Sequence, residues 1–256
     1  MPTDYHALLL DLSGVLYDGE TPIEGAREAV AEARRRGLLL RFVTNTASSD
    51  RQSIIDKLRR MHIDIEADEL FTAPMAAHAY IQQQGLRPFC LIHRAIRSEF
   101  DDIDQHDPNC VLLGDARDDL NYASLNKAFQ LCKQGAPLIG IGMNKYFKEE
   151  QGLMLDAGAF IHAIEWAADT DALIMGKPGR EFFQQVVTST GLPAAQCLMV
   201  GDDLSGDVEG AIDAGLQACL VRTGKFQPQD EDRLPDTASV IDSIAVLFAS
   251  ENRSAF

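Results

Sequence analysis

The sequence has few basic residues and no long apolar run. Its 256 residues contain 23 Lys and Arg against 39 Asp and Glu, which gives a formal net charge of −16. A surface with this charge repels the phosphates of nucleic acids and of anionic lipids. The longest apolar runs, such as 7–10 and 138–141, are far too short to cross a bilayer. We therefore expect neither a nucleic acid nor a membrane as a partner.

Cysteine is scarce and histidine lacks any metal-binding spacing. The five cysteines are widely separated and form no Cys-x-x-Cys pair, which is typical of free thiols in a reducing compartment. The six histidines include no His-x-His or His-Glu-x-x-His arrangement, which argues against a zinc site. Residues 1–5 contain no basic segment of the kind that begins a signal peptide. These absences predict a soluble, cytoplasmic protein.

Strand-like apolar runs alternate with helical patterns along the chain. The runs at 6–11, 38–44 and 196–200 predict buried strands, and the patterns at 49–60 and 180–190 predict helices. We also expect Thr21-Pro22 to cap a helix whose apolar positions are 23, 26, 30 and 33. This alternation predicts an α/β fold with a Rossmann-like, doubly wound parallel sheet.

Residues 77–170 have strands and helices of their own. Strand-like runs occur at 89–92, 110–113 and 137–141, and helical patterns at 120–133 and 159–168. The segment is long enough to be a domain inserted in another. We therefore expect a discontinuous core at 1–76 and 171–256, with an inserted α/β domain at 77–170.

A further strand is expected at 172–175. Polar residues occur at or just after the ends of this strand and of the three core strands predicted above. They are Asp11, Thr44, Asn45, Lys177, Asp202 and, five residues further on, Asp207. In an open parallel sheet, ligands bind outside the carboxyl ends of the strands. We expect the four strands to belong to one sheet, so that these side chains converge on one crevice.

This set of residues suits phosphoryl transfer. A carboxylate is ionised at neutral pH and can act as a nucleophile without a base to activate it. Crowded carboxylates repel one another unless a hard cation lies among them, and Mg²⁺ prefers such oxygen ligands. Lys177 and Thr44 can bind a phosphoryl group, and so can the backbone N–H groups of Leu12 and Ser13. The pattern predicts a Mg²⁺-assisted site that forms an aspartyl-phosphate on Asp11.

The same residues carry a family resemblance. Asp11-Leu12-Ser13-Gly14-Val15-Leu16 resembles the first motif of the haloacid dehalogenase superfamily, and Phe42-Val43-Thr44-Asn45 resembles the second. Gly176-Lys177-Pro178 resembles the third motif, and the segment from Gly201 to Asp207 resembles the fourth. The insertion resembles the C2-type cap of NagD-like nucleotidases and pyridoxal phosphatases. Segments 10–18, 152–156 and 221–226 resemble the branch of phosphatases that act on phospholysine, phosphohistidine and inorganic pyrophosphate.

The resemblance implies a role for each matched residue. Asp11 would be the nucleophile and a Mg²⁺ ligand, together with the Asp202 carboxylate and the Ser13 backbone carbonyl. Asp207 would orient water bound to the metal. The phosphoryl group would be bound by Thr44, Asn45 and Lys177. A homodimer formed through the cap is also implied.

Ser13 departs from the superfamily pattern. Most phosphatases of this superfamily have an aspartate there, which acts as general acid and base. A serine hydroxyl is a poor acid near neutral pH, and general acid–base help is worth on the order of 10²–10⁴-fold. We therefore expect slow hydrolysis of alkyl phosphates and a preference for phosphoramidates, pyrophosphate or activated esters, whose leaving groups need no proton from the enzyme.

Two other functions remain open from the sequence. One is a catalytically weakened protein that retains the fold and the Mg²⁺ site but acts in binding or regulation, for which Ser13 is the supporting feature. The other is a dehalogenase, which also uses an aspartate nucleophile but does not need Mg²⁺. Metal dependence separates this second alternative from a phosphatase.

Overall fold

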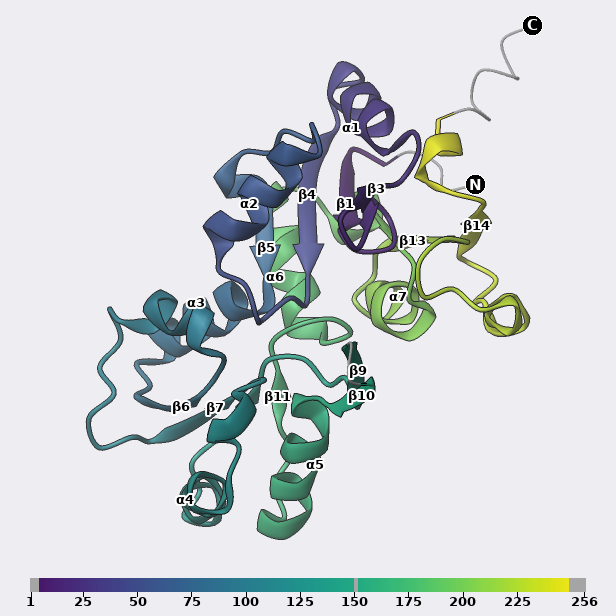
Figure 1. Cartoon of the computed structure of the whole chain (residues 1–256). Coiled ribbons are helices and arrows are strands. Elements are labelled where there is room, and N and C mark those ends of the chain that lie inside the picture. Colours follow the sequence, from purple (N-terminus) through teal and green to yellow (C-terminus); the bar gives the residue numbers. More distant parts are fainter. Residues whose placement is uncertain (1–4, 150–151, 249–256) are drawn as a thin grey trace, which may run out of the picture. The chain divides into compact units, whose positions relative to one another are not determined.

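The computed structural model describes residues 5–149 and 152–248 as an α/β protein, so the predicted fold class is confirmed (Figure 1). The absence of a signal peptide was predicted mainly from residues 1–4, which lie outside this range. None of the helices in the described ranges is long and apolar enough to cross a membrane. The chain divides into two compact units. Unit 1 comprises residues Met1–Thr44, Gln52–Phe71 and Phe183–Phe256, and unit 2 comprises Asn45–Arg51 and Thr72–Phe182. The expected domain boundaries at 76 and 171 stay a prediction.

Unit 1 is built on a six-stranded sheet in the order β14-β13-β12-β1-β4-β5. Its strands are β1 Ala7–Asp11, β4 Leu39–Thr44, β5 Leu70–Thr72, β12 Cys197–Gly201, β13 Gln217–Val221 and β14 Ser239–Ile241. β1 pairs in parallel with both β4 and β12. The chain therefore adds β4 and β5 on one side of β1, and β12, β13 and β14 on the other. The direction in which strands are added reverses at β1, which confirms the doubly wound topology. The switch point therefore lies between β1 and β12, where ligands bind in such sheets.

Helices cover the faces of this sheet. They are α1 Ala26–Arg35, α2 Arg51–Arg60, α6 Arg180–Thr190 and α7 Gly210–Asp213. Alternate residues of the strands point to the same face of the sheet. On one face, Leu10, Phe42 and Val200 belong to a buried cluster that also contains Val30 of α1 and Leu58 of α2. This face of the sheet therefore packs against α1 and α2. The helices expected at 49–60 and 180–190 are confirmed as α2 and α6.

The segment after β1 forms a hairpin rather than a helix cap. β2 (Tyr17–Asp18) pairs antiparallel with β3 (Thr21–Pro22), and Gly19 makes the turn with φ of +55°. Helix α1 begins later, at Ala26, with Gly25 in the left-handed region as its N-cap. The predicted capping role of Thr21-Pro22 is therefore wrong, because both residues are engaged in a strand pair.

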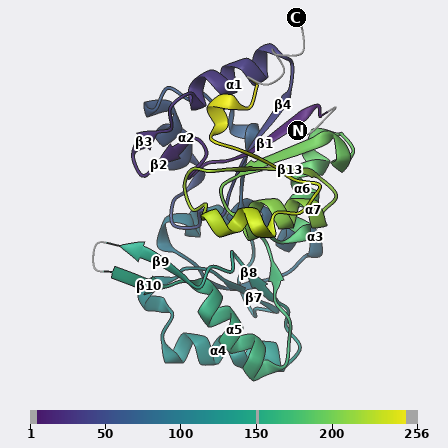
Figure 2. The same ribbon diagram turned by 90° about the vertical axis from the view of Figure 1, so that its right-hand side faces the viewer.

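Unit 2 contains a four-stranded parallel sheet in the order β11-β8-β7-β6. Its strands are β6 Pro88–Leu91, β7 Cys110–Leu113, β8 Leu138–Gly140 and β11 Leu173–Ile174, and its helices are α3 Ala73–Gln84, α4 Tyr122–Lys133 and α5 Ala157–Ala168. Helices α4 and α5 lie side by side and pack on one face of this sheet (Figures 1 and 2). A separate hairpin joins β9 (Tyr146–Glu149) to β10 (Gly152–Leu155).

Strand β11 does not join the six-stranded sheet. It pairs with β8 of unit 2, so the expectation that Lys177 follows a strand of the same sheet as Asp11 is wrong. The physical reason is local packing. A Cβ atom on Gly140 would lie 2.8 Å from Cδ1 of Ile174 and 2.7 Å from Cδ1 of Ile161, so Ile174 packs over the glycine of its neighbouring strand.

Candidate active site

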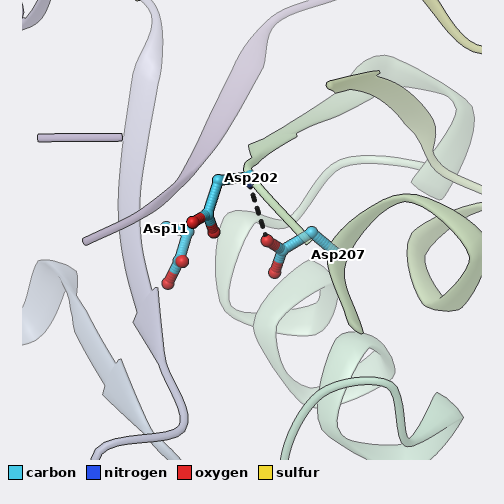
Figure 3. Close-up of side chains that lie close together, drawn as sticks. All are labelled: Asp11, Asp202 and Asp207. Atoms are coloured by element: carbon cyan, nitrogen blue, oxygen red, sulfur yellow. Dashed lines mark hydrogen bonds between the residues drawn. The ribbon is translucent and has the colours of Figure 1, made fainter. Parts of the chain in front are cut away.

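Three aspartates converge at the switch point of the six-stranded sheet. Asp11 is the last residue of β1, and Asp202 directly follows the adjacent strand β12. Asp11, Asp202 and Asp207 are all buried, and one carboxylate oxygen from each lies within 4.8 Å of the others (Figure 3). The structure therefore brings together the three acidic residues that the sequence predicted.

Asp207 is fixed by the backbone that precedes it. It lies in a π-helical turn, Leu204–Glu209, and its Oδ2 atom accepts hydrogen bonds from the N–H groups of Asp202 and Asp203, both at 3.1 Å (Figure 3 draws the first). A Cβ atom on Gly201 would lie 2.2 Å from this carboxylate, so the close approach requires glycine there. Such π-helical turns are frequent at functional sites.

The carboxylate of Asp202 has one oxygen bound and one oxygen available. Oδ2 accepts a hydrogen bond of 2.7 Å from the backbone N–H of Lys225. Oδ1 is buried and has no hydrogen-bond partner. A buried carboxylate oxygen without a partner is costly, and a bound cation would remove that cost. An unpartnered oxygen among three clustered carboxylates fits a hard divalent cation such as Mg²⁺.

Charge repulsion among these groups perturbs Asp202. Burial, followed by the negative charges of Asp11 and Asp207, raises the pKa of Asp202 from 3.8 to about 8. The backbone N–H of Lys225 and, to a smaller extent, its ammonium lower the pKa of Asp202. Burial lowers the pKa of Lys225, but the charges of Asp203 and Asp202 raise it above its ordinary value. The cluster therefore favours a bound proton or a bound cation.

This shift predicts how stability depends on pH without metal. Between pH 4 and 8 folded Asp202 retains a proton that the unfolded chain releases, so its contribution to stability falls as the pH rises. Asp202→Asn removes this dependence. In EDTA, we expect the Tm of Asp202→Asn to exceed that of the wild type at pH 8, with the difference shrinking towards pH 5. Thermal unfolding at several pH values measures it, and a difference independent of pH would contradict the assignment.

The chain turns sharply after Asp11. Leu16 and Tyr17 both donate backbone hydrogen bonds to the Leu12 carbonyl, and the Gly14 N–H donates to the Tyr17 carbonyl at 2.7 Å. Gly14 has φ of +87°, and a Cβ atom there would lie 2.0 Å from Oδ2 of Asp202. Ser13 is exposed at this turn, whereas Leu12 is buried. The turn therefore requires glycine next to the acidic cluster.

Of the predicted phosphate-binding residues, Thr44 belongs to unit 1, whereas Asn45 and Lys177 belong to unit 2. Thr44 is buried at the end of β4, one position beyond Val43, which pairs with Asp11. Asn45 belongs to unit 2, where its side-chain Nδ2 donates to the Lys177 carbonyl and its Oδ1 accepts from the Lys177 N–H, each at 2.7 Å. Asn45 thus fixes the backbone that carries Lys177.

Residues 223–225, which follow β13, contact the site although no role was predicted for them. Thr223 donates a hydrogen bond to the Gly14 carbonyl, and Lys225 contacts Asp202 as described above. A polar Thr-Gly-Lys segment at the end of the apolar run 218–221 is the signal that could have indicated them, because β13 neighbours β12 in the sheet.

Comparisons with known proteins identify the family of this chain. A family model described as haloacid dehalogenase-like hydrolase matches residues 8–106, and a second, HAD-hydrolase-like model matches residues 174–247. The chain is 44% identical over 230 residues to human phospholysine phosphohistidine inorganic pyrophosphate phosphatase, which covers 88% of this chain and 85% of that protein. It is 39% identical to human haloacid dehalogenase-like hydrolase domain-containing protein 2, covering 89% and 88% of the two chains.

Solved structures resemble the fold over nearly the whole chain. A 4-nitrophenylphosphatase from Thermotoga maritima has a TM-score of 0.84 and 26% identity, covering 94% of this chain and 95% of its own. A p-nitrophenyl phosphatase from Archaeoglobus fulgidus has a TM-score of 0.88 at 22% identity, covering 96% and 99%, and supports the fold alone. With two family models and these relatives matched along its length, the chain belongs to the haloacid dehalogenase-like hydrolases.

Proposed function

We propose that this protein is a Mg²⁺-dependent phosphatase that hydrolyses small phosphorylated substrates through an aspartyl-phosphate on Asp11. The observation that carries the proposal is the buried, unpartnered Oδ1 of Asp202 beside the carboxylates of Asp11 and Asp207. Relatives named as phosphatases support the same reaction class. The cation would be bound by Asp11, Asp202 and the Ser13 carbonyl, and would supply positive charge to the phosphoryl oxygens in the transition state.

We assign each residue of the site a role in the proposed phosphoryl transfer. A carboxylate oxygen of Asp11 attacks phosphorus as the bond to the leaving group breaks, and water then hydrolyses the resulting acyl phosphate, releasing phosphate and restoring Asp11. Thr44 orients the transferred group, whereas the phosphate-binding roles of Lys177 and Asn45, which belong to unit 2, stay predictions. Backbone N–H groups of Leu12 and Ser13 donate to the oxygens of the transferred group. Asp207 keeps the cluster ordered through the two hydrogen bonds to its Oδ2.

We further propose a preference for phosphoramidates, pyrophosphate or activated esters over alkyl phosphates. The support is Ser13, which places a weak acid where most phosphatases of the superfamily have an aspartate. One relative is named for phospholysine, phosphohistidine and inorganic pyrophosphate, and one solved neighbour is named for 4-nitrophenyl phosphate, an activated ester. A homodimer through the cap and a cytoplasmic location stay predictions.

Phosphate release tests the proposal directly. With Mg²⁺ we expect turnover of p-nitrophenyl phosphate, pyrophosphate and a phosphoramidate at higher kcat/KM than a sugar phosphate, and loss of all turnover in EDTA because the clustered carboxylates need the cation. Phosphate is assayed with Mg²⁺, with EDTA, and with EDTA followed by excess Mg²⁺ as the reversal control. Mg²⁺ binding without any turnover would favour the binding-protein alternative. Release of halide from a haloacid in EDTA would favour the dehalogenase.

A further inference from the structure

The loop formed by residues 223–225, here called the 223–225 loop, lies against the acidic cluster on the side of β13. The sheet order β13-β12-β1 places the carboxyl ends of three neighbouring strands together. These ends are followed by the 223–225 loop, Asp202 and the turn that contains Gly14. The loop therefore lies next to Asp202, and it contacts both Asp202 and the turn after Asp11.

Two hydrogen bonds join the loop to these neighbours. The N–H of Lys225 donates to Oδ2 of Asp202 at 2.7 Å, and the hydroxyl of Thr223 donates to the carbonyl of Gly14. The first bond leaves Oδ1 of Asp202 as the carboxylate oxygen without a partner. The second ties the loop to the turn whose Ser13 carbonyl is a proposed cation ligand. Both bonds thus act on proposed ligands without touching the cation.

The carboxylate of Asp202 is enclosed by two glycines. A Cβ atom on Gly224 would lie 2.0 Å from Oδ2 of Asp202 and 2.5 Å from Cα of Gly14. A Cβ atom on Gly14 would also lie 2.0 Å from Oδ2 of Asp202. Both glycines have positive φ, +66° and +87°. The carboxylate therefore has little freedom to rotate, and its orientation is set by the backbone on either side.

We propose that the 223–225 loop is a positioning element of the cation site, in which the Lys225 N–H orients the Asp202 carboxylate and the Thr223 hydroxyl fixes the Gly14 turn. The proposal rests on the proposed Mg²⁺ site and adds to it the residues that preorganise two of its ligands. Outer partners that orient metal ligands in this way are typically worth about 10–100-fold in metal affinity.

The side chain of Lys225 has a different role from its backbone. Its Nζ atom forms an ion pair with Oδ2 of Asp203 at 3.2 Å, and the other oxygen of Asp203 accepts from the N–H of Gly206 in the π-helical turn. The ammonium therefore interacts with the helix-capping residue, whereas the backbone N–H interacts with Asp202. Substitution of the side chain alone separates these two contributions.

Calorimetric titration of the metal-free protein with MgCl₂ tests the proposal without measuring activity. Thr223→Val removes the hydroxyl at nearly constant shape, and we expect Mg²⁺ affinity to fall by about 10–100-fold. Thr223→Ser keeps the donor and should restore affinity to within about threefold of the wild type. Lys225→Met keeps the backbone N–H and should weaken Mg²⁺ binding much less than Thr223→Val does. Thr188→Val is the matched control, because that hydroxyl also donates to a backbone carbonyl, Gln184 of α6.

Thermal unfolding in EDTA accompanies each titration, so that loss of the fold is distinguished from loss of positioning. Wild-type affinity in folded Thr223→Val would overturn the positioning role and leave the phosphatase proposal intact. If Lys225→Met lowered Mg²⁺ affinity as much as Thr223→Val does, the proposal that the backbone N–H of Lys225, rather than its side chain, orients Asp202 would be wrong. Absence of Mg²⁺ binding by the wild type would overturn the cation site, and the proposed function with it.

Discussion

Asp11→Asn is expected to lower phosphate release from p-nitrophenyl phosphate in saturating Mg²⁺ by at least about 10⁴-fold. An amide oxygen is a poor nucleophile, so the acyl phosphate cannot form on residue 11. The substitution also removes one of three buried carboxylates that repel one another, and we expect the Tm in EDTA to stay unchanged or rise. Steady-state kinetics and thermal unfolding measure the two effects independently.

Asp18→Asn is the matched control for this substitution. Asp18 is an exposed carboxylate of the same unit, in strand β2, and its neutralisation is expected to leave kcat within about twofold of the wild type. Acid quenching of the wild type during turnover should trap phosphate on the protein, whereas Asp11→Asn should trap none. Substantial turnover by Asp11→Asn would exclude Asp11 as the nucleophile.

Much of the fold is predictable because its elements carry local signals. The runs that became β1, β4 and β12 are almost uninterrupted apolar segments, as expected for strands buried on both faces of a parallel sheet. Helix α6 begins and ends as predicted, with apolar residues at helical spacing and Gly191 after its last turn. These features depend on neighbours in sequence, so one sequence suffices to locate them.

Strand partners are less predictable because they depend on distant residues. Leu173 and Ile174 form a two-residue strand, and nothing in their own sequence distinguishes pairing with β8 from pairing in the larger sheet. In the structure Ile174 packs over Gly140 of β8, which is more than thirty residues away in the sequence. The structure of Thr21-Pro22 could not be predicted for a similar reason. Its sequence favours the start of a helix, but both residues pair with Tyr17 and Asp18 in a hairpin.

In the acidic site, the side chains could be predicted from the sequence but the backbone contacts could not. Asp11, Asp202 and Asp207 could be predicted because chemically distinctive side chains follow apolar strands. The partners of Lys225 and Gly224 could not, because a sequence does not show which group a backbone N–H contacts or where a Cβ atom would have no room. The positioning of Asp202 therefore required the structure, although the chemistry of Asp202 did not.

Ser13→Asp is expected to change the substrate range. Ser13 is exposed at the turn after Asp11, so an aspartate fits there without displacing the buried neighbours Leu12 and Gly14. A carboxylic acid at this position can protonate an alkoxide leaving group, which serine cannot do effectively. We expect kcat/KM for an unactivated sugar phosphate to rise by about 10²–10⁴-fold. For p-nitrophenyl phosphate we expect a change of less than about tenfold, because its phenolate leaves without a proton.

Ser13→Asn separates proton transfer from shape. Asparagine has nearly the size of aspartate but cannot donate a proton as an acid, so we expect no gain with the sugar phosphate. Its backbone carbonyl remains available as the proposed cation ligand, and calorimetric Mg²⁺ affinity in both variants should stay near the wild-type value. The pH profile adds a second distinction, since a general acid introduces a new ionisation in kcat for the sugar phosphate alone. Equal gains in the Asp and Asn variants would mean that residue 13 acts through shape, and the explanation of the substrate preference by proton donation would then be wrong.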